Sequence, residues 1–134
     1  MKKAEKILKL LSDTTRLRII MLLSRKELCV CQMMGVLGIS QPLVSRNLNL
    51  MDAAGFLDER REGKLVFYSL SKSMPPFASK MIAVLAENLK KDRVLGEDIK
   101  SLMDCEEFQK KTGTCDMKTF KDFMTKKRKM SSGK

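Results

Sequence analysis

The sequence predicts a mainly α-helical fold that carries a single β-hairpin, and three observations predict it. Apolar residues recur at helical spacing through residues 4–37. A capping serine followed closely by a proline then opens a further helix at residues 40–42. Two strand-like runs follow, separated by Glu62-Gly63. Three short helices followed by a hairpin are the architecture of a winged helix-turn-helix domain.

The first three helices are predicted from stripes of apolar residues, which we expect to form the core. Ser12 or Asp13 can cap the second helix, and Gly38 is a natural C-terminal stop for the third. The stripes are, in chain order, Ala4, Ile7, Leu8 and Leu11; Leu17, Ile20, Met21 and Leu22; and Val30, Met33, Met34 and Leu37.

The next helix is predicted to be the recognition helix of the helix-turn-helix. Ser40 is its N-cap, Pro42 lies in its first turn, and it ends near Ala54-Gly55. One stripe is predicted to be buried, and another face carries side chains that can reach base edges and phosphates in a major groove. The buried stripe is Val44, Leu48 and Met51, and the candidate DNA contacts are Ser40, Gln41, Ser45, Arg46 and Asn49.

The hairpin is predicted from residues 56–61 and 64–70, with Glu62-Gly63 as its turn. Arg60, Arg61 and Lys64 place positive charge at its tip. A basic hairpin after a helix-turn-helix is typical of a wing that contacts the DNA backbone or minor groove. The alternative is an ordinary solvated hairpin tip.

Composition favours a polyanionic partner and argues against an enzyme. The formal net charge is +11, from 27 basic and 16 acidic residues. Histidine, the commonest general base, is absent, and the chain has no Gly-rich phosphate loop and no nucleophile elbow. No apolar run is long enough to span a bilayer and no signal-peptide pattern is present, so we expect a cytoplasmic protein with reduced cysteines.

A further helix is predicted after Pro75-Pro76, with apolar residues near a heptad spacing. These residues are Phe77, Met81, Val84 and Leu85, with Asn88 one turn further on. We expect this face, with the first helix, to form a homodimer interface. Two-fold symmetry would then let two recognition helices meet successive major grooves of double-stranded operator DNA. Packing within one subunit is the alternative.

The remaining chain is predicted to extend this domain. We place the DNA-binding and dimerisation domain at residues 1–93, a helical extension at 94–125 and a basic disordered tail at 126–134. Ile99, Leu102 and Met103 indicate a sixth helix that holds Cys105, and residues 117–124 a last short one. The extension also carries Cys115.

Three segments together resemble the ArsR family of winged-helix repressors, and more narrowly its arsenic-responsive branch. They are Glu27-Leu28-Cys29-Val30-Cys31, Ser40-Gln41-Pro42-Leu43-Val44-Ser45-Arg46 and Arg60-Arg61-Glu62-Gly63-Lys64. The resemblance covers roughly residues 4–93 and also implies a homodimer. It implies that Cys29 and Cys31 bind As(III) or Sb(III), which are soft ions suited to thiolates, and that binding releases the repressor from its operator.

The chain departs from the family pattern at three positions. Gln32 stands where an aspartate is common, Asn47 where a histidine is common, and Met34 where some relatives have a third cysteine. A third sulfur would therefore come from Cys105, Cys115 or the partner subunit. Cys105 and Cys115 are ten residues apart, a separation that matches no short metal motif, so a purely structural role for both remains an alternative.

Helix geometry supplies a reason why ligation by the first two thiols could act as a switch. Residues i and i+2 of an α-helix lie about 200° apart, so two such sulfurs cannot face one small ion in an intact helix. We therefore expect binding at Cys29 and Cys31 to distort the third helix, which supports the recognition helix.

Several readings remain open at this point. The thiols could form a disulfide or persulfide redox switch, or could bind Cd(II), Pb(II) or Cu(I). Cys29 and Cys31 could also be small core residues. Finally, a winged helix can serve as a protein-interaction module without contacting DNA.

Overall fold

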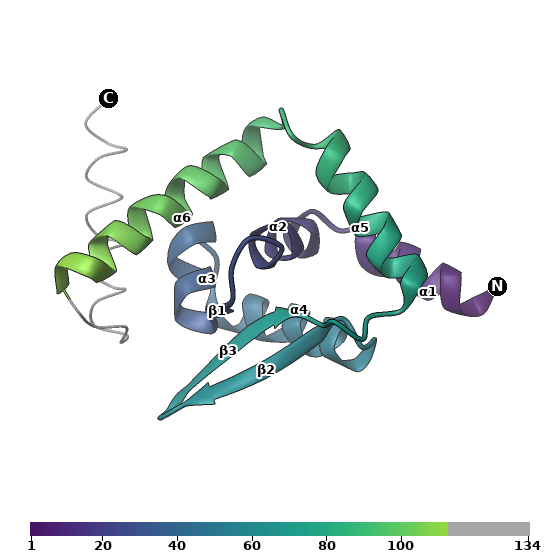
Figure 1. The fold of residues 1–134 in the computed structure, drawn as a ribbon, viewed down its shortest axis with the longest axis horizontal. Coiled ribbons are helices and arrows are strands. Elements are labelled where there is room, and N and C mark those ends of the chain that lie inside the picture. Colours follow the sequence, from purple (N-terminus) through teal and green to yellow (C-terminus); the bar gives the residue numbers. More distant parts are fainter. Residues whose placement is uncertain (113–134) are drawn as a thin grey trace.

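The computed structural model describes residues 1–112, with side chains described to residue 110, as six helices and a three-stranded antiparallel sheet (Figure 1). The prediction of a mainly helical fold with a hairpin wing is confirmed. The elements are α1 Lys2–Leu11, α2 Thr14–Leu23, β1 Leu28–Cys29, α3 Val30–Leu37, α4 Gln41–Ala53, β2 Leu57–Glu62, β3 Leu65–Leu70, α5 Pro76–Asn88 and α6 Arg93–Thr112.

The helix boundaries follow local capping chemistry. Asp13 caps α2, because its carboxylate accepts a 3.0 Å hydrogen bond from the backbone N–H of Arg16. Gly38 ends α3 in the left-handed region at φ 68°, which disfavours side chains with a Cβ. Ser40 then caps α4 through the N–H of Leu43. The turn and the start of the recognition helix therefore lie where the sequence places them.

A short strand, β1, was not predicted. It pairs antiparallel with β3, with Leu28 opposite Tyr68 and Cys29 opposite Phe67, so the sheet has the order β1-β3-β2. Two residues are too few to show an alternating pattern, and therefore the sequence carries no period-2 signal for this strand. The strand joins the start of α3 to the hairpin.

The hairpin turn lies one residue later than predicted. Glu62 pairs with Leu65, so the two turn residues are Gly63 and Lys64, not Glu62 and Gly63. Gly63 has φ 59°, which fits a glycine at the first central position of a type II′ turn. The right-handed twist of the strands favours this turn type, which requires a positive φ at its first central residue, and so the glycine occupies that position.

The core is a single cluster that includes α6. Leu95, Leu102 and Cys105 are buried together with residues of α1 to α5. α6 is the predicted sixth helix and holds Cys105, and it packs along α3 and α2. Cys115, the helix predicted at 117–124 and the tail at 126–134 lie outside the described residues.

A partly buried ion pair joins α6 to the helical body. The guanidinium of Arg18 on α2 donates two hydrogen bonds to Asp98 on α6, at 2.9 and 2.8 Å, and a third of 3.2 Å to the backbone carbonyl of Leu37. The hydrogen bond to Asp98 raises the pKa of Arg18, although burial opposes this rise. One side chain therefore joins α2, α6 and the C-terminal end of α3.

Apolar side chains remain exposed on α1 and α5. Leu8, Phe77 and Val84 are large hydrophobic residues with much of their surface in solvent, whereas Ala78 and Ile82 face the core. Among the described helices, none is long and apolar enough to cross a membrane.

Removing the carboxylate of Asp98 is expected to destabilise the fold. Asp98→Ala leaves Arg18 half-buried without its partner and should lower the free energy of unfolding by about 2–3 kcal/mol. Asp104→Ala is a matched control on the same helix, because Asp104 is exposed, and it should change stability by less than about 0.5 kcal/mol. Chemical denaturation measures both. Equal effects of the two substitutions would show that the ion pair contributes nothing specific.

Candidate functional site

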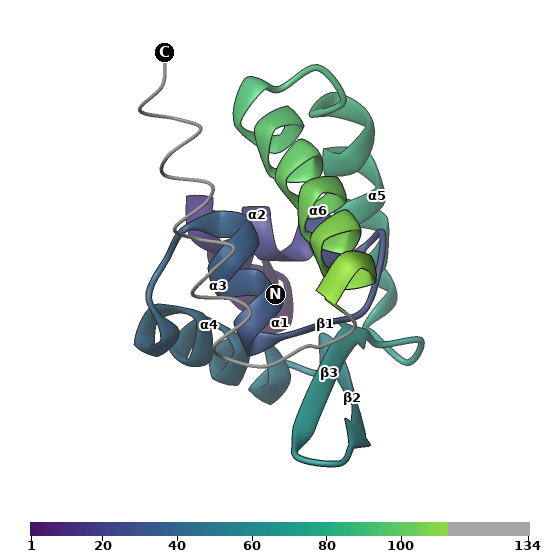
Figure 2. The same ribbon diagram turned by 90° about the vertical axis from the view of Figure 1, so that its left-hand side faces the viewer.

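The polar face of α4 is directed to solvent. Gln41, Arg46 and Asn49 are exposed and Ser45 is half-buried, whereas the stripe of Val44, Leu48 and Met51 is buried, as predicted. Figures 1 and 2 show that α4 and the β2–β3 hairpin lie at the same end of the molecule, away from α5 and α6. This arrangement gives one surface with a helix to enter a groove and a hairpin beside it.

An arginine that the sequence analysis missed fixes the orientation of α4. Arg16 Nη1 donates a 3.2 Å hydrogen bond to Oδ1 of Asn47, and its Nε donates one of 2.9 Å to the carbonyl of Leu10 at the end of α1. Asn47 is only 2% exposed, and its Nδ2 donates to the carbonyl of Leu43 at 2.8 Å. The residue that departs from the family pattern therefore connects α4 to α1 and α2.

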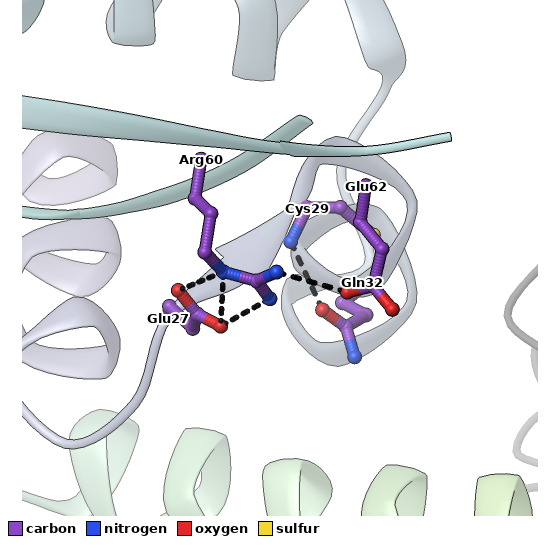
Figure 3. A network of polar contacts seen from close by, with 5 residues as sticks. All are labelled: Glu27, Cys29, Gln32, Arg60 and Glu62. Atoms are coloured by element: carbon purple, nitrogen blue, oxygen red, sulfur yellow. Dashed lines mark hydrogen bonds and ion pairs between the residues drawn. The ribbon is translucent and has the colours of Figure 1, made fainter. Parts of the chain in front are cut away.

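The three basic residues of the hairpin are not equivalent. Arg60 donates to the Glu27 carboxylate at 3.1 Å and to Glu62 at 2.9 Å (Figure 3). It also lies over the Phe67 ring, at 4.7 Å from the centroid. The hydrogen bond with Glu27, and after it the one with Glu62, raises the pKa of Arg60. The same bond with Arg60 lowers the pKa of Glu27. The charge of Arg60 is thus already compensated.

All three residues are exposed, but Arg61 and Lys64 differ from Arg60 in that they form no ion pair with the described part of the chain. Of the three hairpin residues, these two therefore offer uncompensated positive charge to a polyanion. The Glu27 partner of Arg60 was missed, because the two residues are 33 positions apart and nothing local in the sequence pairs them.

Cys29 and Cys31 lie at the junction of the sheet and α3. The expectation that both belong to one helix is wrong. Cys29 is the last residue of β1 and the N-cap of α3, with an extended backbone at φ −90° and ψ 169°. Pairing with Phe67 holds it in that conformation. Cys31 is the second residue of α3, so the 200° separation of two helical positions does not apply to this pair.

Gln32 organises this junction. Its Oε1 accepts a 2.9 Å hydrogen bond from the backbone N–H of Cys29, which forms half of a capping box. Its Nε2 donates a 3.1 Å hydrogen bond to Oε1 of Gln109 on α6. Figure 3 shows the first of these bonds beside the Arg60 network. Gln32 is buried, so one amide joins β1, α3 and α6.

The three described thiols differ in exposure. Cys29 and Cys105 are each 2% exposed and Cys31 is half-buried, and all three are free of disulfides. Among the side chains of residues 1–110, no three cysteine, aspartate or glutamate groups are arranged to hold a metal ion. A ligand bound by several of these thiols would therefore need the junction to change shape.

Sequence comparison finds bacterial regulators. A family model described as "Bacterial regulatory protein, arsR family" matches residues 13–59. The arsenical resistance operon repressor of Escherichia coli K12 is 47% identical over 77 residues, which cover 57% of this chain and 66% of that protein. The arsenic resistance transcriptional regulator ArsR2 of Pseudomonas putida is 42% identical over 79 residues, covering 58% and 69%.

A cadmium resistance regulator is also similar. The CadC homolog of Staphylococcus aureus is 44% identical over 66 residues, which cover 48% of this chain and 54% of that protein. The matched segment thus spans from 54% to 69% of the length of these three relatives.

Structural comparison finds winged-helix regulators. HlyU from Vibrio cholerae N16961 matches with a TM-score of 0.60 and 30% identity, covering 67% of this chain and 95% of that one. The transcriptional repressor BigR from Xylella fastidiosa matches with a TM-score of 0.60 and 26% identity, covering 69% and 88%. The predicted winged helix-turn-helix is therefore confirmed.

Two asparagines on α4 allow a matched test of its placement. Asn47→Ala removes the acceptor of Arg16 and should lower the free energy of unfolding by about 1–3 kcal/mol, because a buried donor loses its partner. Asn49→Ala, the same substitution on the exposed face, should change it by less than about 0.5 kcal/mol. Thermal or urea unfolding measures the difference. If Asn47→Ala were as mild as Asn49→Ala, the Arg16 contact would not hold α4 in place.

Proposed function

The chain belongs to the arsR family of bacterial regulatory proteins, and on that premise we propose that it is a homodimeric repressor induced by trivalent arsenic or antimony. Members of this family are DNA-binding transcriptional regulators and not enzymes. In the proposed mechanism, the free protein occupies its operator, and thiolate ligation of the metalloid releases it. The observation that carries the proposal is the position of Cys29 and Cys31, where the sheet of the wing meets α3.

Operator binding is supported by the surface at one end of the molecule. The exposed side chains of α4 can contact base edges in a major groove, and Arg61 and Lys64 can contact the phosphate backbone beside it. The proposed DNA contacts are Ser40, Gln41, Ser45, Arg46, Asn49, Arg61 and Lys64. Arg60, which the sequence places in this set, is proposed to shape the wing, since its charge is compensated by Glu27 and Glu62.

Dimerisation is supported by the exposed apolar residues of α1 and α5. Leu8, Phe77 and Val84 are poorly covered in a single chain, and burial of such surface favours association. A two-fold axis beside these helices would place the two copies of α4 on the same side of the dimer. Such a dimer suits a pseudo-palindromic operator.

Two routes connect the thiols to the DNA-binding surface. The first runs along α3 to the turn at Gly38, directly before the cap of α4. The second runs across the sheet, because Cys29 pairs with Phe67, which in turn pairs with Arg60. Glu27, two residues before Cys29, also reaches Arg60. Any ligand that displaces Cys29 therefore acts on α3 and on the wing at once.

The ligand chemistry fits a soft, low-coordinate ion. Thiolates prefer soft ions, and As(III) and Sb(III) are satisfied by three sulfur ligands. The chain has no histidine, which nitrogen-ligated zinc or nickel sites commonly use. Two of the relatives are named as arsenic or arsenical resistance regulators and one as a cadmium resistance regulator, so cadmium is the second candidate inducer.

Titration of the reduced protein bound to its upstream DNA tests the inducer. Arsenite should release the DNA, and Cys29→Ser and Cys31→Ser should each keep it bound at arsenite concentrations that empty the wild-type complex. Fluorescence anisotropy follows the release. A wild-type complex that survives excess arsenite would exclude the proposal. Release by Cd(II) and not by arsenite would favour a cadmium sensor. Release by a mild oxidant that reductant reverses, with no effect of arsenite, would favour a redox switch.

Salt dependence of operator binding tests the assignment of the wing charges. Arg61→Ala should lower the slope of log K against log[salt] by about one, because it removes one phosphate contact. Arg60→Ala should change this slope less, because its charge is already paired with carboxylates. Lys100→Ala on α6 is the control and should leave the slope unchanged. A larger slope change for Arg60→Ala than for Arg61→Ala would reverse the assignment.

A further inference from the structure

We infer that Cys105 of α6 supplies the third thiolate of the metalloid site, together with Cys29 and Cys31. This inference rests on the proposed function and identifies the third sulfur ligand, which the segment with Cys29 and Cys31 does not supply. Met34 occupies the position of a third cysteine in some relatives, and a thioether is a weaker ligand than a thiolate. The structure offers a thiol from another helix in its place.

Two polar contacts join the segment that carries Cys29 and Cys31 to the part of α6 that follows Cys105. Lys26 Nζ lies 3.2 Å from Oε1 of Glu106, and Gln32 Nε2 lies 3.1 Å from Oε1 of Gln109. Residues 26 and 32 flank the segment that carries Cys29 and Cys31, while Cys105 directly precedes Glu106. The segment 26–32 therefore runs alongside residues 105–109 of α6, and the packing of α6 on α3 agrees.

Cys105 belongs to the face of α6 that meets α3. Cys105 and Gln109 are four residues apart, so they lie on the same side of the helix and one turn apart. Gln109 contacts α3 directly, and Cys105 is buried in the core cluster, against which the half-buried Cys31 packs. The thiol thus points into the protein, toward the elements that carry the other two thiols.

Assembly of the site requires a movement, because the described groups are not arranged to hold an ion. Arg18 anchors α6 through the buried Asp98, so we take α6 as the fixed partner. The first turn of α3 is held by the Gln32 side chain, which caps Cys29 and contacts Gln109. Drawing Cys29 and Cys31 toward Cys105 would disturb this cap and the pairing of β1 with β3. The free energy of ligation would then be coupled to changes in α3 and in the sheet, the two elements that reach the DNA-binding surface.

The proposed binding step is a ligand exchange without redox change. Arsenous acid, As(OH)₃, reacts with three thiols; three As–S bonds form and three As–O bonds break. Each thiol proton leaves with one hydroxide as water, so three water molecules are released and arsenic stays trivalent. With only two thiols available, two waters are released and one As–O bond remains.

X-ray absorption of arsenic bound to the full-length reduced protein tests this inference. The wild type should show three As–S bonds. Cys105→Ala should show two As–S bonds and one As–O bond, with arsenite affinity weakened by more than about tenfold. Cys115→Ala should keep three As–S bonds and the wild-type affinity.

A control separates ligation from packing. Leu102→Ala also truncates a buried side chain of α6 but keeps every thiol, so it should lower stability and retain three As–S bonds. Operator affinity without arsenite, measured for each variant, verifies that the DNA-binding fold is intact.

The outcomes distinguish this inference from the proposed function. A wild-type protein that binds arsenite and releases DNA, but with only two As–S bonds, would overturn the role of Cys105 alone. Three As–S bonds in Cys105→Ala, or their loss in Cys115→Ala, would do the same. A wild-type protein that binds no arsenite would overturn the proposed function itself.

Discussion

The pairing of two residues with the central strand of the sheet determines much of this structure. Because Leu28 and Cys29 are bonded to β3, the chain enters α3 from the sheet and not from a free loop. This entry places one thiol in an extended segment and the next in a helix. It also puts Cys29, Phe67 and Arg60 in one row across three strands. The strand pairing therefore connects the segment that carries Cys29 directly to the two strands of the wing.

The sequence predicts the features that depend on local chemistry. The Ser40 cap, the Gly38 stop and the buried stripe of α4 each follow from residues that are close in the chain, and the structure has all three. The errors lie in the sheet: β1 was missed, so Cys29 was placed in a helix, and the hairpin turn was placed one residue too early. A strand of two residues has no periodicity, and the position of a hairpin turn depends on the register of strands that a sequence pattern locates only approximately.

The contacts that position the candidate site are distant in sequence, which explains why they were missed. Arg16 and Asn47 are 31 residues apart, and Arg18 and Asp98 are 80 residues apart. No local pattern pairs such residues, although in each pair the fold buries the acceptor, Asn47 or Asp98. Cys105 differs, because the sequence already offers it, with Cys115 and the partner subunit, as a source of a third sulfur. The sequence does not choose among these sources, and the packing of α6 on α3 is what brings residues 105–109 alongside the segment with Cys29 and Cys31.

The amide at position 32 has a consequence for how a C-terminal helix can be added to this fold. An aspartate there, the common choice in the family, is also an acceptor for the N–H of Cys29, but its side chain is one methylene shorter and has no hydrogen to donate to Gln109. Gln32 does both at once. Grafting α6 onto a relative with aspartate at this position would therefore require Gln109 to turn its amide and donate across a longer gap, so this contact between α3 and α6 would be weakened. A helix such as α6 therefore suits a chain with glutamine at position 32, and adding the helix to a chain without that amide would weaken its attachment to α3.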